Sequence, residues 1–349
     1  MKISILLPGN TNRATGGYKV IYEYCNKLSI YGHDVCIYYY YGSMFESLHL
    51  PECIRLLFVK YFSEIVGPGL WFDLNKKIKK KVIHSSAEIS NADVVIATSI
   101  GTAKDVFELP SECGKKFYFI QGFENWNCSD AEVYASYKYD MTKIVVANWL
   151  KKIVDMHSYS ESILVSNCIN TNIFYNKENE RKKHSIVFHY RSDECKGSKY
   201  ALEVIEILMK KYADLSVDVI SAEKKPNNLP RCCTYHYKIR ADEISEINNN
   251  SQVFMCSSLE EGFGLPGLEA MACGCALVST SYKGVLEYAI DSVNALLSPI
   301  KDAKSMADNV ERLFENEILR KRITKNGIKT GIERSLDKSA KKFESALTK

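Results

Sequence analysis

The fold of this chain is decided by residues 253–274, which read VFMCSSLEEGFGLPGLEAMACG. The apolar run Val253–Ser257 is typical of a buried strand, and Leu265–Cys273 is expected to be helical because Pro266 suits a first helical turn. Between them, Gly262 and Gly264 permit a tight turn and a close approach of the backbone to a ligand. The stretch therefore predicts a strand–turn–helix unit, the repeat from which parallel α/β sheets are built.

The same alternation of short apolar runs and amphipathic segments continues in both directions from this stretch. Strands are expected at Lys2–Leu7, Asp34–Tyr40, Val94–Thr98, Lys116–Ile120, Lys143–Ala147, Ser185–His189, Ser216–Ile220 and Ala276–Ser279. Helical spacing is clearest at Tyr18–Ile30 and Lys199–Lys211. The pattern predicts an α/β protein of two doubly wound, Rossmann-like halves.

A polar, charged run at 176–183 interrupts this pattern and marks the expected boundary between the halves. The 349 residues also suit two domains of about 150 residues each. We expect an N-terminal domain over 1–172 and a C-terminal domain over 173–329. A last helix over about 330–349 is expected to pack back on the first domain.

Composition excludes several classes of protein. The net charge of +4, from 46 basic and 42 acidic residues, is too balanced for a surface that binds nucleic acid. No apolar run reaches the roughly 18 residues of a membrane span, and the first residues do not resemble a secretory signal. The 12 cysteines form no C-x2-C pair, so reduced thiols in a cytoplasmic protein are expected.

Two carboxylates flank the glycine-rich turn, Glu261 within it and Glu269 in the helix that follows. The amides at a helix N-terminus attract anions such as phosphate. Carboxylates are natural acceptors for sugar hydroxyls. This combination suits a ligand that carries both phosphate and sugar.

Glu261 and Glu269, set in E-G-F-G-L-P-x-x-E-A-M-A-x-G, resemble the E-x7-E signature of retaining glycosyltransferases of family 4. The resemblance implies the GT-B fold, in which two Rossmann-like domains face a central cleft. It also implies that Glu261 contacts the transferred sugar and that Glu269 binds the nucleotide ribose. The diphosphate would then meet the amides around Gly262, Phe263, Gly264 and Leu265.

Two further loops are similar to elements of that family. Arg191 and Lys196 follow the strand Ser185–His189 with the spacing of G-R-x4-K-G, although Tyr190 replaces the usual first glycine. Cations there would stabilise the leaving diphosphate more in the transition state than in the ground state. The pair Gly16 and Gly17 resembles the G-G loop that family members place near the donor phosphates, and a simple turn is the alternative.

The acceptor side is expected at the end of the strand Lys116–Ile120. Many relatives carry a histidine in this region, whereas this chain carries Gln121, Glu124 and Trp126. A Q-x-x-E string is similar to one in a rhamnosyltransferase-like subgroup. Trp126 suits stacking on a sugar ring, and a buried aromatic is the alternative interpretation.

Five lysines in six residues, Lys76, Lys77, Lys79, Lys80 and Lys81, form the strongest local charge. A solvated helix face is the default expectation. The alternative is peripheral contact with an anionic membrane, because many relatives act on lipid-linked acceptors.

No two aspartates stand at positions i and i+2, so the D-x-D metal clamp of the other large glycosyltransferase fold is absent and no metal or other cofactor is expected. The resemblance implies metal-independent, retaining transfer from a nucleotide sugar to a glycan or lipid-linked glycan in surface polysaccharide assembly. An epimerase or a phosphorylase of the same fold is the main alternative. A nicotinamide-dependent dehydrogenase would need the missing G-x-G-x-x-G, and a non-catalytic sugar-binding protein would not need all four charged residues.

Overall fold

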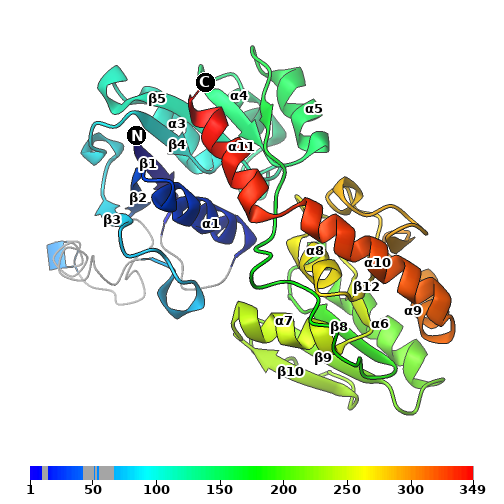
Figure 1. Cartoon of the computed structure of the whole chain (residues 1–349). Coiled ribbons are helices and arrows are strands. Elements are labelled where there is room, and N and C mark those ends of the chain that lie inside the picture. The colour runs from blue at the N-terminus through cyan, green and yellow to red at the C-terminus, as the bar shows by residue number, and fades with distance from the viewer. Residues whose placement is uncertain (10–14, 42–50, 52, 55–66, 349) are drawn as a thin grey trace. The chain divides into compact units, whose positions relative to one another are not determined.

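The computed structural model describes residues 1–9, 15–41, 51, 53–54 and 67–348 (Figure 1). The chain divides into two compact units. Unit 1 contains Met1–Ser166 and Asp337–Lys349, and unit 2 contains Asn167–Leu336.

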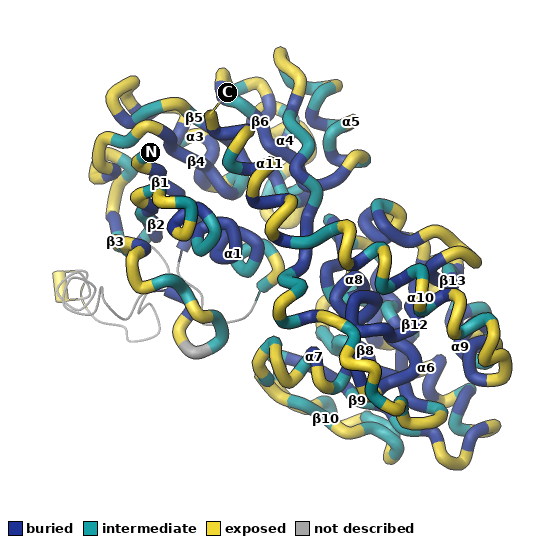
Figure 2. The backbone as a smooth tube through the Cα atoms, in the orientation of Figure 1, coloured by how far each residue is buried: buried dark blue, intermediate teal, exposed yellow. Residues whose placement is uncertain are grey.

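Unit 1 is built on a parallel sheet of seven strands in the order β3-β2-β1-β4-β5-β6-β7. The strands are β1 (Lys2–Leu7), β2 (Asp34–Tyr40), β3 (Lys79–Ile83), β4 (Val94–Ala97), β5 (Lys115–Ile120), β6 (Thr142–Val145) and β7 (Ile163–Leu164). Central strands such as β1 and β4 are buried almost throughout, as expected of a sheet covered on both faces. Figure 2 shows these strands in dark blue.

The main helices of unit 1 are α1 (Gly16–Ile30), α3 (Ile100–Glu108), α4 (Asp130–Ser136), α5 (Asn148–His157) and α11 (Leu336–Thr348). α11 returns from the end of the chain and packs against α1 and β5. The ring of Phe343 stacks on Tyr24 at 4.5 Å and lies 5.3 Å from Phe119. Ion pairs of Lys27 with Asp337 and of His33 with Glu344 join the polar side of α11 to α1 and the turn after it.

Unit 2 contains a second parallel sheet of six strands in the order β10-β9-β8-β11-β12-β13. The strands are β8 (Ser185–His189), β9 (Ser216–Ser221), β10 (Cys233–Tyr237), β11 (Val253–Cys256), β12 (Ala276–Thr280) and β13 (Ala295–Ser298). This is the doubly wound order: three strands are added toward one edge of the sheet, and from the fourth strand on they are added toward the other edge, beside the first strand. The reversal, or switch point, lies between β8 and β11 in unit 2 and between β1 and β4 in unit 1.

The main helices of unit 2 are α6 (Ser198–Met209), α7 (Ala241–Asn250), α8 (Leu265–Ala272), α9 (Ala303–Glu315) and α10 (Glu317–Glu333). One core joins alternate residues of the strands, such as Ile186 and Phe188 of β8, to α6 and α9. The predicted class of two doubly wound α/β halves is confirmed. Where a helix over about 330–349 was expected, α10 ends at Glu333 and α11 begins at Leu336.

The expectation of a helix face over the lysine cluster is wrong. Lys79–Ile83 forms β3, an edge strand that pairs in parallel with β2. Lys79 Nζ lies 2.8 Å from Asp34 Oδ2, and Lys81 Nζ donates to Ser90 Oγ at 3.2 Å. Lysines on an edge strand discourage pairing with a second sheet, and they mask the apolar alternation by which strands are recognised.

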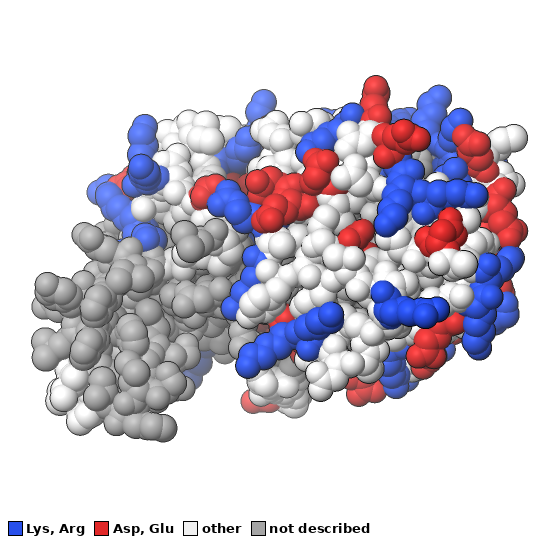
Figure 3. Space-filling view, turned by 90° about the horizontal axis from the view of Figure 1, so that it is seen from below, with Lys and Arg blue, Asp and Glu red and all other residues white. Residues whose placement is uncertain are grey.

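Charges of both signs are spread over the described surface. On the face drawn in Figure 3, basic and acidic side chains are interspersed, in keeping with the net charge of +4. No helix of the described residues is long and apolar enough to cross a membrane.

Candidate functional site

Two loops meet at the switch point of unit 2, one after β8 and one after β11. The carbonyl of Cys195 in the first loop accepts hydrogen bonds from the backbone N–H groups of Leu259 at 2.7 Å and Glu260 at 3.2 Å. These bonds place Lys196 of the first loop beside Glu261 of the second, while Arg191, in the same loop as Lys196, is bonded to Glu223 and Asp193. In doubly wound sheets this position, beyond the carboxyl ends of the strands, is where ligands bind.

Gly197 makes this approach of the two loops possible. Its φ of +60° is in the left-handed region that favours glycine, and a Cβ there would lie 2.1 Å from the carbonyl oxygen of Ser257. No side chain fits at that distance from a backbone atom. The glycine beside Lys196 is therefore required by the contact between the loops as well as by its own backbone conformation.

The predicted sugar-contacting carboxylate is held between a cation and a hydroxyl. Lys196 Nζ lies 3.3 Å from Glu261 Oε1, and Ser258 Oγ donates to the same oxygen at 2.6 Å. The Lys196 side chain is 29% exposed and that of Glu261 is 15% exposed, so a ligand can reach both. A cation and an anion side by side provide one group for a phosphate and one for a sugar hydroxyl.

Arg191 is held by a partner that sequence reasoning missed. Its Nε donates to Glu223 Oε1 at 3.1 Å, and its Nη2 donates to Asp193 Oδ2 at 2.9 Å. Glu223 follows β9, the strand beside β8, and it also accepts from the N–H of Ser192 at 3.0 Å. The two carboxylates orient the guanidinium while 39% of the Arg191 side chain stays exposed.

The turn before α8 buries its aromatic side chain. Gly264 has φ +88°, and a Cβ there would lie 1.9 Å from the hydroxyl oxygen of Tyr282. The ring of Phe263 is buried, with the ring of Tyr288 at 5.4 Å and the guanidinium of Arg334 at 5.9 Å. Among Gly262, Phe263, Gly264 and Leu265, only backbone groups are therefore suited to a diphosphate.

Glu269 lies in the second turn of α8 and is 5% exposed. Its burial contrasts with the partial exposure of Glu261, eight residues earlier. The predicted ribose contact would have to use the small part of the residue that remains accessible.

In unit 1, the predicted residues lie at the carboxyl ends of β1 and β5. Gly16 and Gly17 begin α1, and Gln121 Nε2 donates to the carbonyl of Gly17 at 3.2 Å. Trp126 is 71% exposed, so the alternative of a buried aromatic is wrong. Gln121 and the G-G loop are thus in direct contact.

Glu124 is partly buried at the N-terminus of α3. Its Oε2 accepts a hydrogen bond from the N–H of Ile100 at 2.5 Å. Burial raises the pKa of the Glu124 carboxyl to about 7, and the bond from Ile100 opposes part of that shift. With this pKa, both the ionised and the protonated form of the carboxyl are populated at neutral pH.

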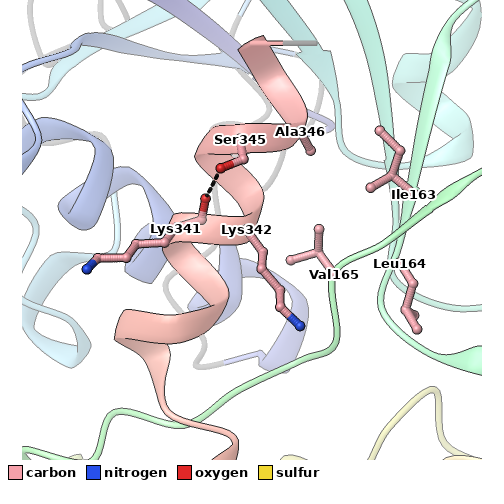
Figure 4. A pocket seen from close by; sticks show the side chains of 7 residues that line it. All are labelled: Ile163, Leu164, Val165, Lys341, Lys342, Ser345 and Ala346. Atoms are coloured by element: carbon pink, nitrogen blue, oxygen red, sulfur yellow. Dashed lines mark hydrogen bonds between the residues drawn. The ribbon is translucent and has the colours of Figure 1, made fainter.

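A pocket of about 340 Å³ in unit 1 contains none of the predicted residues. It lies between α11 and the segment that includes β7, and Figure 4 shows Ile163, Leu164 and Val165 on one side. Within the part of the chain that the structure describes, no group of three or more His, Cys, Asp or Glu residues could hold a metal ion.

Comparison with known proteins gives a family match that lies within unit 2. Residues 170–330 match the family model described as glycosyl transferases group 1. The N,N'-diacetylbacillosaminyl-diphospho-undecaprenol α-1,3-N-acetylgalactosaminyltransferase of Campylobacter jejuni is 32% identical over 98 residues, 28% of this chain and 26% of that protein. The capsular polysaccharide biosynthesis glycosyltransferase CapM of Staphylococcus aureus is 32% identical over 89 residues, 26% of this chain and 23% of CapM. The chain thus aligns with about a quarter of the length of each relative.

Among solved structures, HepE of Anabaena in complex with UDP and glucose is similar over the whole chain. The TM-score is 0.74 at 12% identity, and the match covers 100% of this chain and 99% of HepE. At that identity the likeness shows the fold, which is GT-B.

Proposed function

We propose, from the match of residues 170–330 to the group 1 glycosyl transferases, that this protein is a retaining, metal-independent glycosyltransferase. It moves a sugar from a nucleotide-sugar donor to a glycan or lipid-linked glycan acceptor. The C1–O bond to the diphosphate breaks and the nucleoside diphosphate leaves. The acceptor hydroxyl loses its proton, its oxygen bonds to C1, and the anomeric configuration is kept.

The observation that carries this proposal is the contact between Lys196 and Glu261 at the switch point of unit 2, with Arg191 in the same loop as Lys196. Fixed cations near the diphosphate stabilise the charge that develops on the leaving group, and the α8 amides add to that stabilisation. Lys196 is 3.3 Å from Glu261, so one donor molecule can contact the ammonium with phosphate and the carboxylate with sugar. Glu261 acts by positioning and electrostatics, and Glu269 binds the ribose.

We assign the acceptor to unit 1 and the pathway to surface polysaccharide assembly. Gln121, Glu124 and Trp126 supply an amide, a carboxyl group and an exposed indole, which are groups that bind sugars. The names of the two relatives, one acting on a diphospho-undecaprenol glycan and one in capsule biosynthesis, support this class of acceptor. The finer assignment to a rhamnosyltransferase-like subgroup rests on Gln121 and Glu124 alone.

A thermal-shift screen with UDP, GDP, dTDP and ADP tests the donor site. A nucleotide at 100 times its Kd should stabilise unit 2 by about 2.7 kcal/mol. UDP is tested first because HepE was solved with UDP. If none of the four raises the melting temperature, the donor-site proposal fails.

Product analysis then separates transfer from the main alternative. Incubation with the matching nucleotide sugar and a glycan acceptor should release nucleoside diphosphate and form a glycoside of retained configuration, with or without EDTA. A phosphorylase would instead need inorganic phosphate or a sugar phosphate, and an epimerase would return an isomeric nucleotide sugar. Strict dependence on added metal would count against the proposed mechanism.

We also propose that Lys76, Lys77, Lys79, Lys80 and Lys81 attach unit 1 peripherally to the cytoplasmic face of an anionic membrane. Lys79, Lys80 and Lys81 lie on the edge strand β3, and Lys76 and Lys77 lie exposed just before it. Anionic headgroups attract such a cluster by about 1 kcal/mol per charge. Changing the five lysines to glutamate should abolish co-sedimentation with phosphatidylglycerol vesicles. Equal sedimentation of both proteins would end this proposal.

A further inference from the structure

The loop after β5 contains, within six residues, three side chains of the kinds that bind saccharides. Gln121 offers an amide, Glu124 a carboxyl group and Trp126 an indole, all within 121–126. β5 lies beside β4, one of the two strands at the switch point of unit 1. The loop therefore stands at the carboxyl edge of the sheet where ligands bind in this topology.

The carboxyl group of Glu124 uses only one of its oxygens within the protein. Oε2 accepts from the N–H of Ile100 at 2.5 Å. Among the residues that the structure describes, none donates a hydrogen bond to Oε1. Oε1 is not among the fully buried polar atoms of the described residues that lack a partner, so it is reachable from solvent and open to a ligand hydroxyl.

The titratable groups around Glu124 do not supply a positive charge. Tyr118 of β5, Tyr137 after α4 and Cys128 of the same loop interact electrostatically with Glu124. Burial raises the pKa of each of the three, so they stay neutral at pH 7. Within the described residues, the Ile100 N–H at the start of α3 is the group that stabilises the ionised form.

Trp126 gives this loop an exposed aromatic surface. The outer edge of the indole lies 3.6 Å from the position that a Cβ on Gly122 would occupy, so the ring covers the backbone of Gly122. The residue is nevertheless 71% exposed. An aromatic ring that is open to solvent, two residues from Glu124 in the same loop, is suited to stacking on the apolar face of a sugar.

We propose that ionised Glu124 binds a hydroxyl of a saccharide acceptor through Oε1, with Trp126 stacking on the same sugar, so that protonation of Glu124 weakens acceptor binding. This inference rests on the proposed function and adds a pH-dependent positioning residue to it. A hydroxyl that donates to a carboxylate forms a charge-assisted bond, roughly twice as strong as the neutral bond left after protonation.

The dependence should fall in the range of ordinary cytoplasmic pH. With a pKa of about 7, Glu124 is mostly ionised at pH 8 and mostly protonated at pH 6. The ionised fraction changes about tenfold over this range. An unperturbed glutamate, with a pKa of about 4.3, would show no change there.

Saturation-transfer NMR on the full chain tests the proposal. The probes are the methyl glycosides of glucose, galactose, N-acetylglucosamine and rhamnose, at pH 6 and pH 8. At least one glycoside should bind the wild type up to about tenfold more weakly at pH 6 than at pH 8. Glu124→Gln should bind it about tenfold more weakly than wild type at pH 8, and equally at both pH values. Trp126→Ala should weaken binding at both pH values.

Glu112→Gln, an exposed carboxyl of the same unit, is the matched control and should behave as wild type. Far-UV circular dichroism and the thermal unfolding curve show that each variant is folded, and the UDP-induced thermal shift reports on unit 2 alone. Wild-type binding that is equal at both pH values, unchanged binding in Glu124→Gln, or no glycoside binding at pH 8 overturns the inference.

If UDP binds but the glycosides do not, this inference fails while the donor proposal stands. If the glycosides bind with the expected pH dependence but no nucleotide binds, the transferase proposal fails while the saccharide site stands.

Discussion

The two units place functional loops at the same point of the same strand order, but they differ in how charge is arranged there. In unit 2 the ionised groups are paired: Lys196 with Glu261, and Arg191 with Glu223 and Asp193. In unit 1 the partly buried carboxyl of Glu124 has a backbone N–H and neutral residues around it. The common topology therefore does not determine the chemistry of the ligand.

The difference follows from what each proposed ligand needs. A diphosphate brings two or more negative charges, so its site requires cations that are held in place before the ligand arrives. A neutral saccharide brings hydroxyl groups, which need an acceptor and an apolar surface. The predictions below test this contrast, beginning with the largest expected effect.

Gly197→Ala should destabilise unit 2 by about 4 kcal/mol. The left-handed backbone costs about 1–3 kcal/mol for alanine, and the clash with the Ser257 carbonyl adds a similar amount. Urea unfolding measures the change. Gly16→Ala in unit 1 is the control, because no atom lies within 4 Å of the position that a Cβ would take there and its φ is not in the left-handed region. Equal stability of the two variants would show that the loop contact in unit 2 is unimportant.

Glu261→Ala should lower kcat about 100- to 1,000-fold, the usual cost of one lost electrostatic contact in a transition state. Nucleotide affinity should change little because Glu261 is assigned to the sugar. Steady-state kinetics and nucleotide titration separate the two quantities, and Glu203→Ala on the exposed side of α6 is the control. Wild-type turnover in Glu261→Ala would remove this residue from the mechanism.

Glu124→Gln should stabilise unit 1 by roughly 3 kcal/mol at pH 8 and by little at pH 5. The pKa of Glu124 rises from 4.5 to about 7 on folding, so the folded state holds a proton that the unfolded state has released. Wild-type stability is therefore lost as pH rises from about 4.5 through 7, whereas glutamine does not titrate. Urea unfolding at the two pH values, with Glu112→Gln as the control, measures the difference. A stabilisation that is equal at both pH values would contradict this account.

Arg191→Ala should weaken binding of a nucleoside diphosphate about tenfold, near the value of one charge-assisted hydrogen bond. The matching nucleoside, which has no phosphate, should bind both proteins equally. Calorimetric titration of both ligands gives this comparison, and Arg231→Ala, an exposed arginine of the same unit, is the control. Equal losses for nucleoside and diphosphate would mean that Arg191 supports the loop and does not contact phosphate.

Much of the fold could be predicted from the sequence because buried parallel strands are continuous apolar runs. Lys2–Leu7, Asp34–Tyr40 and Ser185–His189 form strands with the expected bounds. The strands that were missed lie at or near the ends of the sheets, and they are short or partly exposed, such as β3 with its lysines and β10 with a mixed burial pattern. Edge strands lack the two covered faces that produce an apolar run.

The residue types at the site could also be read from the sequence, since Glu261, Arg191 and Lys196 occur in spaced motifs. Their partners could not. Glu223 is 32 residues from Arg191 and belongs to no motif, yet it holds the guanidinium in place. The exposure of Trp126 and the burial of Glu269 could likewise not be predicted from the sequence, because each depends on residues that are distant in the sequence.

By itself, the sequence determined the strand–turn–helix repeats, the two-unit α/β class and the charged residues available at the strand ends. These properties depend on local hydrophobic periodicity and on glycine positions, and both are properties of short stretches of sequence. Only the tertiary structure decided which charges meet, which carboxyl keeps an oxygen without a donor and which glycine is required by a neighbouring loop. Those outcomes arise because parallel strands that are distant in sequence end at the same edge of a sheet, where burial and contact set the energy of each group.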